Sequence, residues 1–217
     1  MISIAKITEE IVRQTPYIEE ALMKGIINLS GLARSIQSQI EKKVKKKIKI
    51  GAIIVALKRL KNNISAKTQK TIFIQPLNMT VRSDLMEFTF TNSETLIECQ
   101  KQLLQEIERE REIFCNITHG MSETTIIASV ILKDKIKMVF RKEKLIAKIE
   151  RLSSVTIKYP DEIIYTPAVY YTVLKLLAWE GINLIEAAST YTELTLVFKG
   201  EDVNRAFAAL TDYFKRE

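Results

Sequence analysis

The C-terminal third of the chain decides the fold, and it reads LSSVTIKYP at residues 152–160, TPAVYYTVLKLLAWEG at 166–181, INLIEAAST at 182–190, TELTLVFKG at 192–200 and EDVNRAFAALTDYF at 201–214. The first, third and fourth stretches alternate apolar and polar residues with the period of a strand. The second and fifth repeat apolar residues with the period of a helix. This order of strand, helix, strand, strand and helix predicts a small module built on an antiparallel sheet.

The middle of the chain repeats the same order of elements. DLMEFTF at 84–90 alternates as a strand, and Asn92 or Ser93 caps a following helix. Two further strands, EIFCNIT and ETTIIASV, are joined by a turn at His119-Gly120, and a helix at 133–141 then leads into the strand KLIAKIE. Because the two copies share little sequence identity, we expect an internal repeat at the level of structure.

Composition and punctuation divide the chain into four segments. Residues 1–70 have a helical pattern, and residues 71–83 form a polar connector with one short strand, TIFIQ at 71–75. The first module is expected at 84–150 and the second at 151–217, where one strand runs almost directly into the next. The predicted fold class is therefore α+β: a helical N-terminal domain followed by two tandem ferredoxin-like βαββαβ modules with antiparallel sheets.

Helix start and stop signals punctuate the N-terminal domain. Thr15 and Pro16 predict the start of a second helix, because proline suits the first helical position. Gly25 predicts the end of that helix, and Ser30 is expected to cap the next one. A further helix is expected to begin around Gly51.

The segment Thr166-Pro167-Ala168-Val169 and the second module around it resemble the ACT domain, the amino-acid-binding regulatory module. The resemblance is to the tandem copies at the C-terminal end of aspartokinases. It implies a cytoplasmic regulatory protein that senses a small-molecule effector, an amino acid, and that forms a homodimer through its sheets. The aspartokinase catalytic domain, with its Lys-Phe-Gly-Gly-type motif, is missing, so we expect no enzyme activity.

The resemblance also implies a ligand site. In the family this loop usually reads Pro-Gly-Val, and its backbone N–H groups meet the ligand carboxylate at a helix N-terminus. Here Ala168 replaces the glycine, and an asparagine like Asn183 contributes to effector binding in aspartokinases. The alternative is that these residues only shape turns and that the module is a ligand-free dimerisation scaffold. The expected ligand-binding residues are Pro167, Ala168, Val169, Asn183, Leu184 and Ser189.

Charge is distributed unevenly along the chain. Residues 1–70 carry 15 lysine and arginine residues against 5 acids, whereas residues 71–217 carry 18 against 21. We expect the run KKVKKKIKI at 42–50 to be helical, with its lysines around the axis and Val44 and Ile48 pointing inward. Such a patch suits nucleic-acid phosphates. The expected nucleic-acid-binding residues are Lys42, Lys43, Lys45, Lys46, Lys47, Lys49, Lys58 and Arg59.

Three interpretations of this basic domain stay open at this stage. The first is a helix-turn-helix with LSGLAR as its first helix and residues 51–61 as the reader, although AIIVAL is too apolar to read base edges and the turn is too long. The second is a solvated basic face, or a surface that contacts a separate aspartokinase or other biosynthetic enzyme. The third is an acidic membrane surface, for which a Trp or Phe face is lacking.

Other classes of site lack their signatures in the sequence. None of the six glycines forms a GxGxxG motif or a phosphate-binding loop, and no apolar run approaches the roughly 18 residues of a membrane span. Cys99 and Cys115 have no metal-ligand spacing and are expected to be reduced thiols in core positions. The single histidine, His119, is expected to be a turn residue. We therefore expect no metal and no cofactor.

Overall fold

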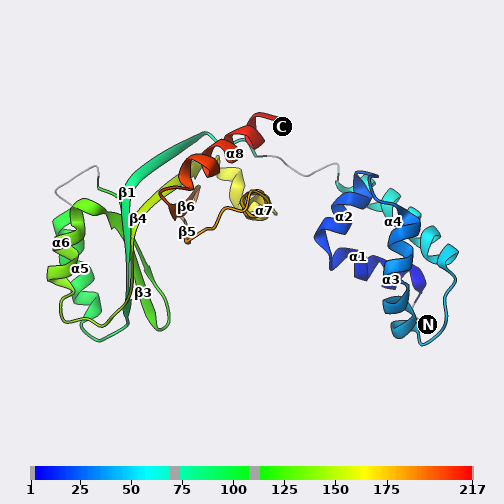
Figure 1. Ribbon diagram of the computed structural model, residues 1–217, viewed down its shortest axis with the longest axis horizontal. Coiled ribbons are helices and arrows are strands. Elements are labelled where there is room, and N and C mark those ends of the chain that lie inside the picture. Colours follow the sequence, from blue (N-terminus) through cyan, green and yellow to red (C-terminus); the bar gives the residue numbers. More distant parts are fainter. Residues whose placement is uncertain (1–2, 69–73, 108–112, 217) are drawn as a thin grey trace. The chain divides into compact units, whose positions relative to one another are not determined.

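Two units, Met1–Ile72 and Phe73–Glu217, make up the chain in the computed structural model. The structure describes residues 3–68, 74–107 and 113–216. Over these residues, no helix has both the length and the apolar character needed to cross a membrane. Among residues 3–68 the first unit has helices and no strand, whereas the second combines helices with an antiparallel sheet (Figure 1). The predicted α+β class is therefore confirmed.

The first unit consists of α1 (Ile4–Arg13), α2 (Pro16–Met23), α3 (Leu29–Val44) and α4 (Ile50–Thr68). Helices α1 and α4 each contact the other three helices of this unit. One apolar face of each helix is buried, as the helical period predicts. The core is formed by Ile7, Ile11, Val12, Leu22, Leu32, Ala33, Ile36, Ile40, Ile48, Ile53, Leu57 and Leu60.

Two predictions about α3 were wrong. The helix is capped by Asn28 and not by Ser30, because the Asn28 side-chain oxygen accepts hydrogen bonds from the N–H groups of Ser30 and Gly31, both at 3.0 Å. The helix also ends at Val44, and Lys45 adopts a left-handed conformation with φ 56°. The lysine run is therefore helical only at its start, and its remaining lysines lie in the turn between α3 and α4.

The second unit is built on a six-stranded antiparallel sheet with the order β2-β3-β1-β4-β6-β5. The strands are β1 (Asn78–Thr91), β2 (Cys115–His119), β3 (Glu123–Ser129), β4 (Leu145–Lys158), β5 (Glu186–Ser189) and β6 (Glu193–Lys199). The helices are α5 (Leu96–Ile107), α6 (Lys133–Val139), α7 (Val169–Trp179) and α8 (Val203–Arg216), with 3₁₀ turns η1 (Val130–Leu132) and η2 (Asp161–Tyr165).

Strands β1 and β4 are 14 residues long and run through both halves of the sheet. Residues 78–82 of β1 pair with 154–158 of β4, although the sequence pattern predicted a connector over 71–83 and a strand only from Asp84. The mostly polar sequence NMTVR at 78–82 does not by itself predict a strand. It forms one because its backbone pairs with β4. The predicted run of one strand into the next near 149–152 is confirmed, since β4 is continuous there.

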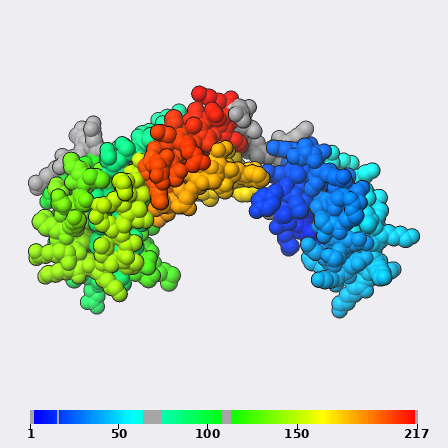
Figure 2. Space-filling view, viewed as in Figure 1, coloured from blue at the N-terminus to red at the C-terminus, as the bar shows by residue number. Residues whose placement is uncertain are grey.

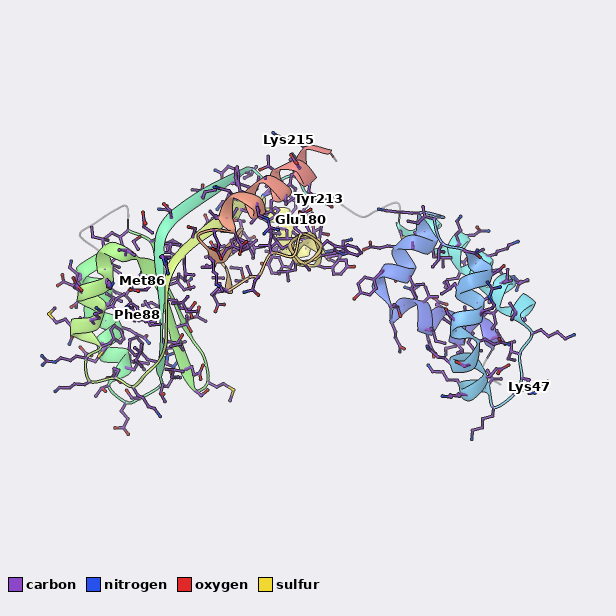
Figure 3. The ribbon with its side chains drawn as sticks, in the orientation of Figure 1. Lys47, Met86, Phe88, Glu180, Tyr213 and Lys215 are labelled. Atoms are coloured by element: carbon purple, nitrogen blue, oxygen red, sulfur yellow. The ribbon has the colours of Figure 1, made fainter. Side chains whose placement is uncertain are left out.

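Each half of the sheet carries its own helices on an apolar core. Met86 and Phe88 of β1 (Figure 3), together with Phe90, pack with residues of α5 and α6. The Phe90 and Phe140 rings stack with centroids 4.8 Å apart. Val155 and Ile157 of β4 belong to a second core that includes residues of α7 and α8. Figure 2 shows the α7 and α8 segments side by side on the surface of this half. Both helix N-termini, of α5 and of α7, follow the end of a central strand.

Candidate ligand pocket

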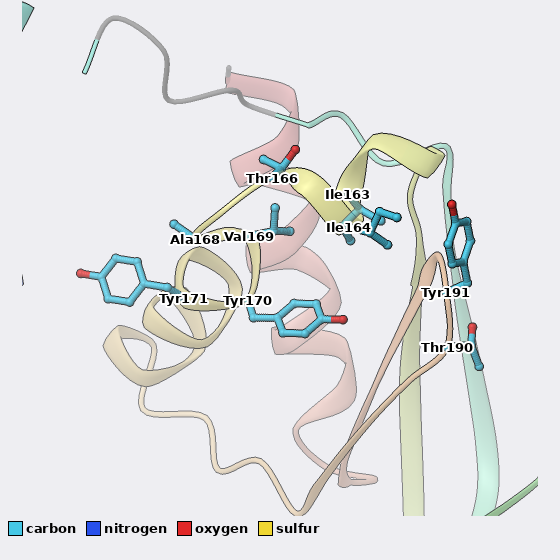
Figure 4. Close-up of a pocket in the computed structure, with 9 residues that line it drawn as sticks. All are labelled: Ile163, Ile164, Thr166, Ala168, Val169, Tyr170, Tyr171, Thr190 and Tyr191. Atoms are coloured by element: carbon cyan, nitrogen blue, oxygen red, sulfur yellow. The ribbon is translucent and has the colours of Figure 1, made fainter. Parts of the chain in front are cut away.

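A pocket of about 500 Å³ lies at the N-terminus of α7 (Figure 4). Three segments supply its described lining: the 3₁₀ turn η2, the start of α7, and the turn between β5 and β6. The lining combines aliphatic side chains, three tyrosine rings and two threonine hydroxyls. These residues are Ile163, Ile164, Thr166, Ala168, Val169, Tyr170, Tyr171, Thr190 and Tyr191.

The first turn of α7 presents backbone donors to this pocket. Ala168 is the residue before the helix, and no side-chain hydrogen bond of the described residues caps the helix there. Because the first intrahelical bond runs from the Thr172 N–H to the Ala168 carbonyl at 3.0 Å, the amides of Val169 and Tyr170 lack an acceptor in the described part of the chain. A helix N-terminus with free amides favours an anion, since the donors and the helix dipole act together.

Ala168 stands in a left-handed conformation, with φ 69° and ψ 5°. Glycine reaches this region without cost, whereas a residue with a Cβ pays about 1–2 kcal/mol. The loop therefore keeps the backbone path that a glycine would favour, although the sequence has alanine. The methyl group adds to the pocket wall and leaves the neighbouring amides in place.

A buried phenol lies close to this pocket. Tyr159 follows β4 directly, is fully buried, and its hydroxyl has no hydrogen-bond partner among the described residues. Burial raises the pKa of Tyr159, and the nearby Tyr170 and Tyr213 raise it further. The group therefore stays a neutral phenol that keeps its proton for donation.

The structure separates the residues expected at the ligand site into two groups. Ala168 and Val169 line the pocket, Pro167 directly precedes them, and Ser189 ends β5 one residue before Thr190. Asn183 and Leu184 lie in the loop after the other end of α7, which is eleven residues and roughly 16 Å long. The described lining of the pocket does not include them, so their role in binding stays a prediction.

The sequence analysis did not anticipate the contribution of η2. Ile163 and Ile164 form one wall of the pocket, and Ile163 is also part of the core of this half. In the sequence they are two adjacent apolar residues within DEIIY, between Pro160 and Thr166. This pair is too short to reveal a helical or strand period, so its role follows from the folded structure only.

The N-terminus of α5 occupies the corresponding place in the other half, and the Glu143 carboxylate of the chain itself lies beside it. Glu143 accepts hydrogen bonds from the Ser93 hydroxyl at 2.5 Å and the Thr95 hydroxyl at 2.7 Å. Ser93 in turn accepts the Leu96 N–H at 3.1 Å. These bonds lower the pKa of Glu143, so it is an anion at neutral pH. A carboxylate of the chain thus lies at the start of α5, where it contacts hydroxyl groups and not the helix amides, whereas no described side chain caps α7.

The basic residues expected to contact nucleic acid lie on three elements of the first unit. Lys42 and Lys43 are on α3, and Lys43 forms an exposed ion pair with Glu10 at 3.4 Å. Lys58 and Arg59 are exposed on α4, whose apolar face is buried in the core. The remaining four, Lys45, Lys46, Lys47 and Lys49, are exposed in the turn from α3 to α4. The role of α4 as the reader helix stays a prediction.

The cysteines and the histidine show no sign of a reactive or metal site. Burial raises the pKa of the Cys115 thiol to about 11, which keeps it protonated at neutral pH. His119 ends β2, and its Nδ1 lies 2.8 Å from the Thr124 hydroxyl. No cluster of three metal-ligating side chains occurs over residues 3–68, 74–107 and 113–216.

Neither a protein-family model nor a curated protein sequence matches this chain. Solved structures do match. Aspartate kinase from Clostridium acetobutylicum has 12% sequence identity and a TM-score of 0.54, over 68% of this chain and 37% of that one. Aspartate kinase from Synechocystis has 15% identity and a TM-score of 0.54, over 65% and 27% of the two chains.

The regulatory subunit of aspartate kinase from Thermus thermophilus, in a ligand-free form, has 12% identity and a TM-score of 0.50, over 64% of this chain and 97% of that one. The chain thus spans about a third of the whole kinases and nearly all of the regulatory subunit. At these identities the likeness concerns the fold. As the sequence resemblance predicted, the structural neighbours of this chain are the ACT-type regulatory subunits and regulatory domains of aspartokinases.

Proposed function

We propose that this protein is a non-catalytic regulatory protein whose second unit binds a small carboxylate, an amino acid, at the N-terminus of α7. The observation that carries the proposal is the contrast between the two helix N-termini. The first residues of α7 line a pocket of about 500 Å³ and no described side chain caps this helix, whereas the Glu143 carboxylate lies beside the start of α5, bound to the Ser93 and Thr95 hydroxyls. An external carboxylate would take at α7 the place that Glu143 takes beside the start of α5, and would contact the helix amides directly.

The pocket matches the chemistry of an amino acid. The carboxylate would accept hydrogen bonds from the Val169 and Tyr170 amides, and the helix dipole adds about 0.3–1 kcal/mol for an anion at this position. The ligand side chain would lie against Ile163, Ile164 and the tyrosine rings. The Thr190 hydroxyl, across the pocket on the β5–β6 turn, offers both a donor and an acceptor to an amino group.

The sheet supports a division into two ferredoxin-like modules that share their central strands. The first module would use β2-β3-β1-β4, with the second half of β1 and the first half of β4. The second would use β5-β6-β4-β1, with the remaining halves of the same two strands. Each set has the strand order of a βαββαβ module. The edge strands β2 and β5 would then pair with a second copy in the proposed homodimer.

A second candidate function follows from one comparison. The chain covers 97% of a regulatory subunit of aspartate kinase, so a role as the regulatory partner of a separate aspartokinase is the alternative output of the same sensor. In that case the ligand would change affinity for the kinase by a coupling free energy of typically 1–3 kcal/mol. Co-sedimentation with an aspartokinase, with and without the amino acid, distinguishes this output from one that needs no enzyme.

A thermal-shift screen of the twenty amino acids tests the ligand site. A ligand at 100 times its Kd stabilises the folded state by about 2.7 kcal/mol, so a bound amino acid raises the Tm. Ala168→Asp places a carboxylate beside the same amides and should abolish the shift. Ala168→Gly is the matched control and should preserve it. If no amino acid raises the Tm, or if Ala168→Asp responds like the wild type, the proposed site is wrong.

A further inference from the structure

The exposed face of α3 in the first unit has an unusual composition. The opposite face of the helix, with Leu32, Ile36 and Ile40, is buried in the core. The exposed face carries no acid and no large apolar side chain. It presents Arg34, Ser35, Ser38, Gln39 and Lys42, all exposed and all on one side of the helix.

The lysine turn after α3 is held in place by α3 itself. The Gln37 side-chain amide donates to the Ile48 carbonyl at 2.9 Å, and the Ile48 N–H donates to the Glu41 carboxylate at 2.8 Å. Ile48 is only 8% exposed, so its side chain anchors the turn in the core. Lys45, Lys46, Lys47 and Lys49 therefore project from a fixed backbone, and Figure 3 shows Lys47 in the turn that follows α3.

The charges of this surface are largely uncompensated. Between Leu29 and Lys49 the sequence holds seven lysine and arginine residues and one acid, Glu41, which is engaged with the Ile48 amide. Lys43 pairs with Glu10, whereas the other six basic side chains form no ion pair with the residues that the structure describes. A cationic surface of this kind binds polyanions through release of counterions.

From these observations we infer that α3 is a groove-binding helix for double-stranded DNA and that the α3–α4 turn contacts the backbone phosphates. Arginine, glutamine and serine are residues that hydrogen-bond base edges, and a single helix fits the major groove of B-form DNA. The lysines of the turn would position the helix without reading sequence. An anionic membrane is less suited, because membrane-surface helices need apolar side chains beside their lysines. This site is independent of the pocket at α7.

The test measures binding of the full chain to a random-sequence DNA duplex of about 30 base pairs over a range of salt concentrations. Each phosphate contact contributes about 0.9 to the slope of log K against log salt. The double change Lys45→Ala with Lys46→Ala should therefore lower the slope by about 2. The matched control, Arg141→Ala with Lys142→Ala, removes two adjacent exposed cations from the second unit and should leave the slope unchanged.

A second pair of variants tests the helix itself. Gln39→Glu places one negative charge on the exposed face of α3 at nearly constant shape and should weaken binding about tenfold, as expected for a charge set against the groove. Gln102→Glu makes the same change on an exposed site of α5 and should have no effect. Circular dichroism checks that all variants keep their helical content.

The proposal also predicts a choice between polyanions. Duplex DNA should bind more tightly than duplex RNA of the same length, because the major groove of A-form RNA is too narrow for a helix. Equal binding of the two duplexes, or Gln39→Glu at wild-type affinity, would overturn groove binding by α3. Unchanged affinity and slope in the Lys45 and Lys46 variant, or binding to anionic lipid vesicles in place of DNA, would overturn the nucleic-acid site altogether.

Discussion

Replacing Glu143 by alanine tests whether the carboxylate beside the start of α5 stabilises the protein. The proposed ligand site at α7 rests on the comparison with this carboxylate. The change removes the acceptor of two short hydroxyl hydrogen bonds, from Ser93 and Thr95. Each such bond contributes about 0.5–1.5 kcal/mol, and the site is half-exposed, so the expected loss in free energy of unfolding is about 1–2 kcal/mol. Glu94 lies in the same segment, is exposed and provides the control, because Glu94→Ala should cost less than about 0.5 kcal/mol.

Urea unfolding at two pH values measures this effect. The single tryptophan, Trp179, reports on the second unit by fluorescence, and circular dichroism reports on the whole chain. Because the folded pKa of Glu143 is lowered, its stabilisation is present above the unfolded pKa of about 4.3 and disappears as pH falls through the folded pKa. The difference between wild type and Glu143→Ala should therefore be full at pH 7 and vanish well below pH 4.

Added acetate sharpens the experiment. In Glu143→Ala the α5 terminus loses its internal anion, so acetate should stabilise this variant more than the wild type. If Glu143→Ala costs no more than Glu94→Ala, or if the difference persists at low pH, the carboxylate does not stabilise the helix terminus. The analogy that assigns an external carboxylate to α7 would then lose its basis.

Three further predictions concern single sites. Glu87→Gln should raise the free energy of unfolding by about 1–2 kcal/mol at pH 7, because burial and then Glu186 raise the pKa of Glu87. The charged form of Glu87 costs stability as pH rises through the folded pKa. The stability difference between Glu87→Gln and wild type should therefore shrink in urea titrations near pH 4. Ala168→Gly should stabilise the second unit by about 0.5–1 kcal/mol in thermal unfolding, since relief of the left-handed alanine exceeds the added chain entropy. Ile48→Ala should lower the stability of the first unit by about 2–4 kcal/mol, as measured by circular dichroism. It should also weaken DNA binding in a salt titration, although all the lysines of the turn are kept. Undiminished DNA binding by this folded variant would show that DNA binding does not need the fixed turn.

Apolar periodicity identified most elements but not their partners. The strands around Phe88, Val155 and Leu196 and the helices around Leu103 and Leu177 were visible because one face of each is buried, and that face repeats with the period of its element. The first residues of β1, Asn78–Arg82, were missed because they are mostly exposed and their strand conformation depends on pairing with β4. Long-range pairing of this kind leaves no local pattern.

The prediction that the lysine run is helical was wrong for a related reason. Local pattern placed Val44 and Ile48 on one helical face, and helix propensity alone gives no reason to stop. The helix stops at Val44 because Ile48 becomes a core residue by a different path, with its backbone held by Gln37 and Glu41. A side chain can reach the same core from a helix or from a turn, and the sequence does not distinguish the two.

At the candidate site, the residues next to the helix start were predictable and the rest of the pocket was not. The resemblance to the family's Pro-Gly-Val loop placed Ala168 and Val169 at the helix start, and both line the pocket. The opposite wall comes from Thr190 and Tyr191 on the β5–β6 turn, and their approach to α7 depends on the sheet register. The Glu143 carboxylate was likewise hidden, because it lies 50 residues from Ser93 along the chain.

The shared central strands give the proposed sensor a means of communication within the second unit. Tyr159 and η2 follow β4 directly, so a ligand that orders η2 against α7 acts at the end of a strand that continues unbroken to Leu145 in the other half. Two residues of these strands, Asp84 in β1 and Arg151 in β4, are left-handed and lie at the register shifts where the halves meet, so a change in one strand must be accommodated by the other. A ligand effect would thus be transmitted through the β1–β4 ladder, because these two strands belong to both halves and neither half has a complete sheet without them.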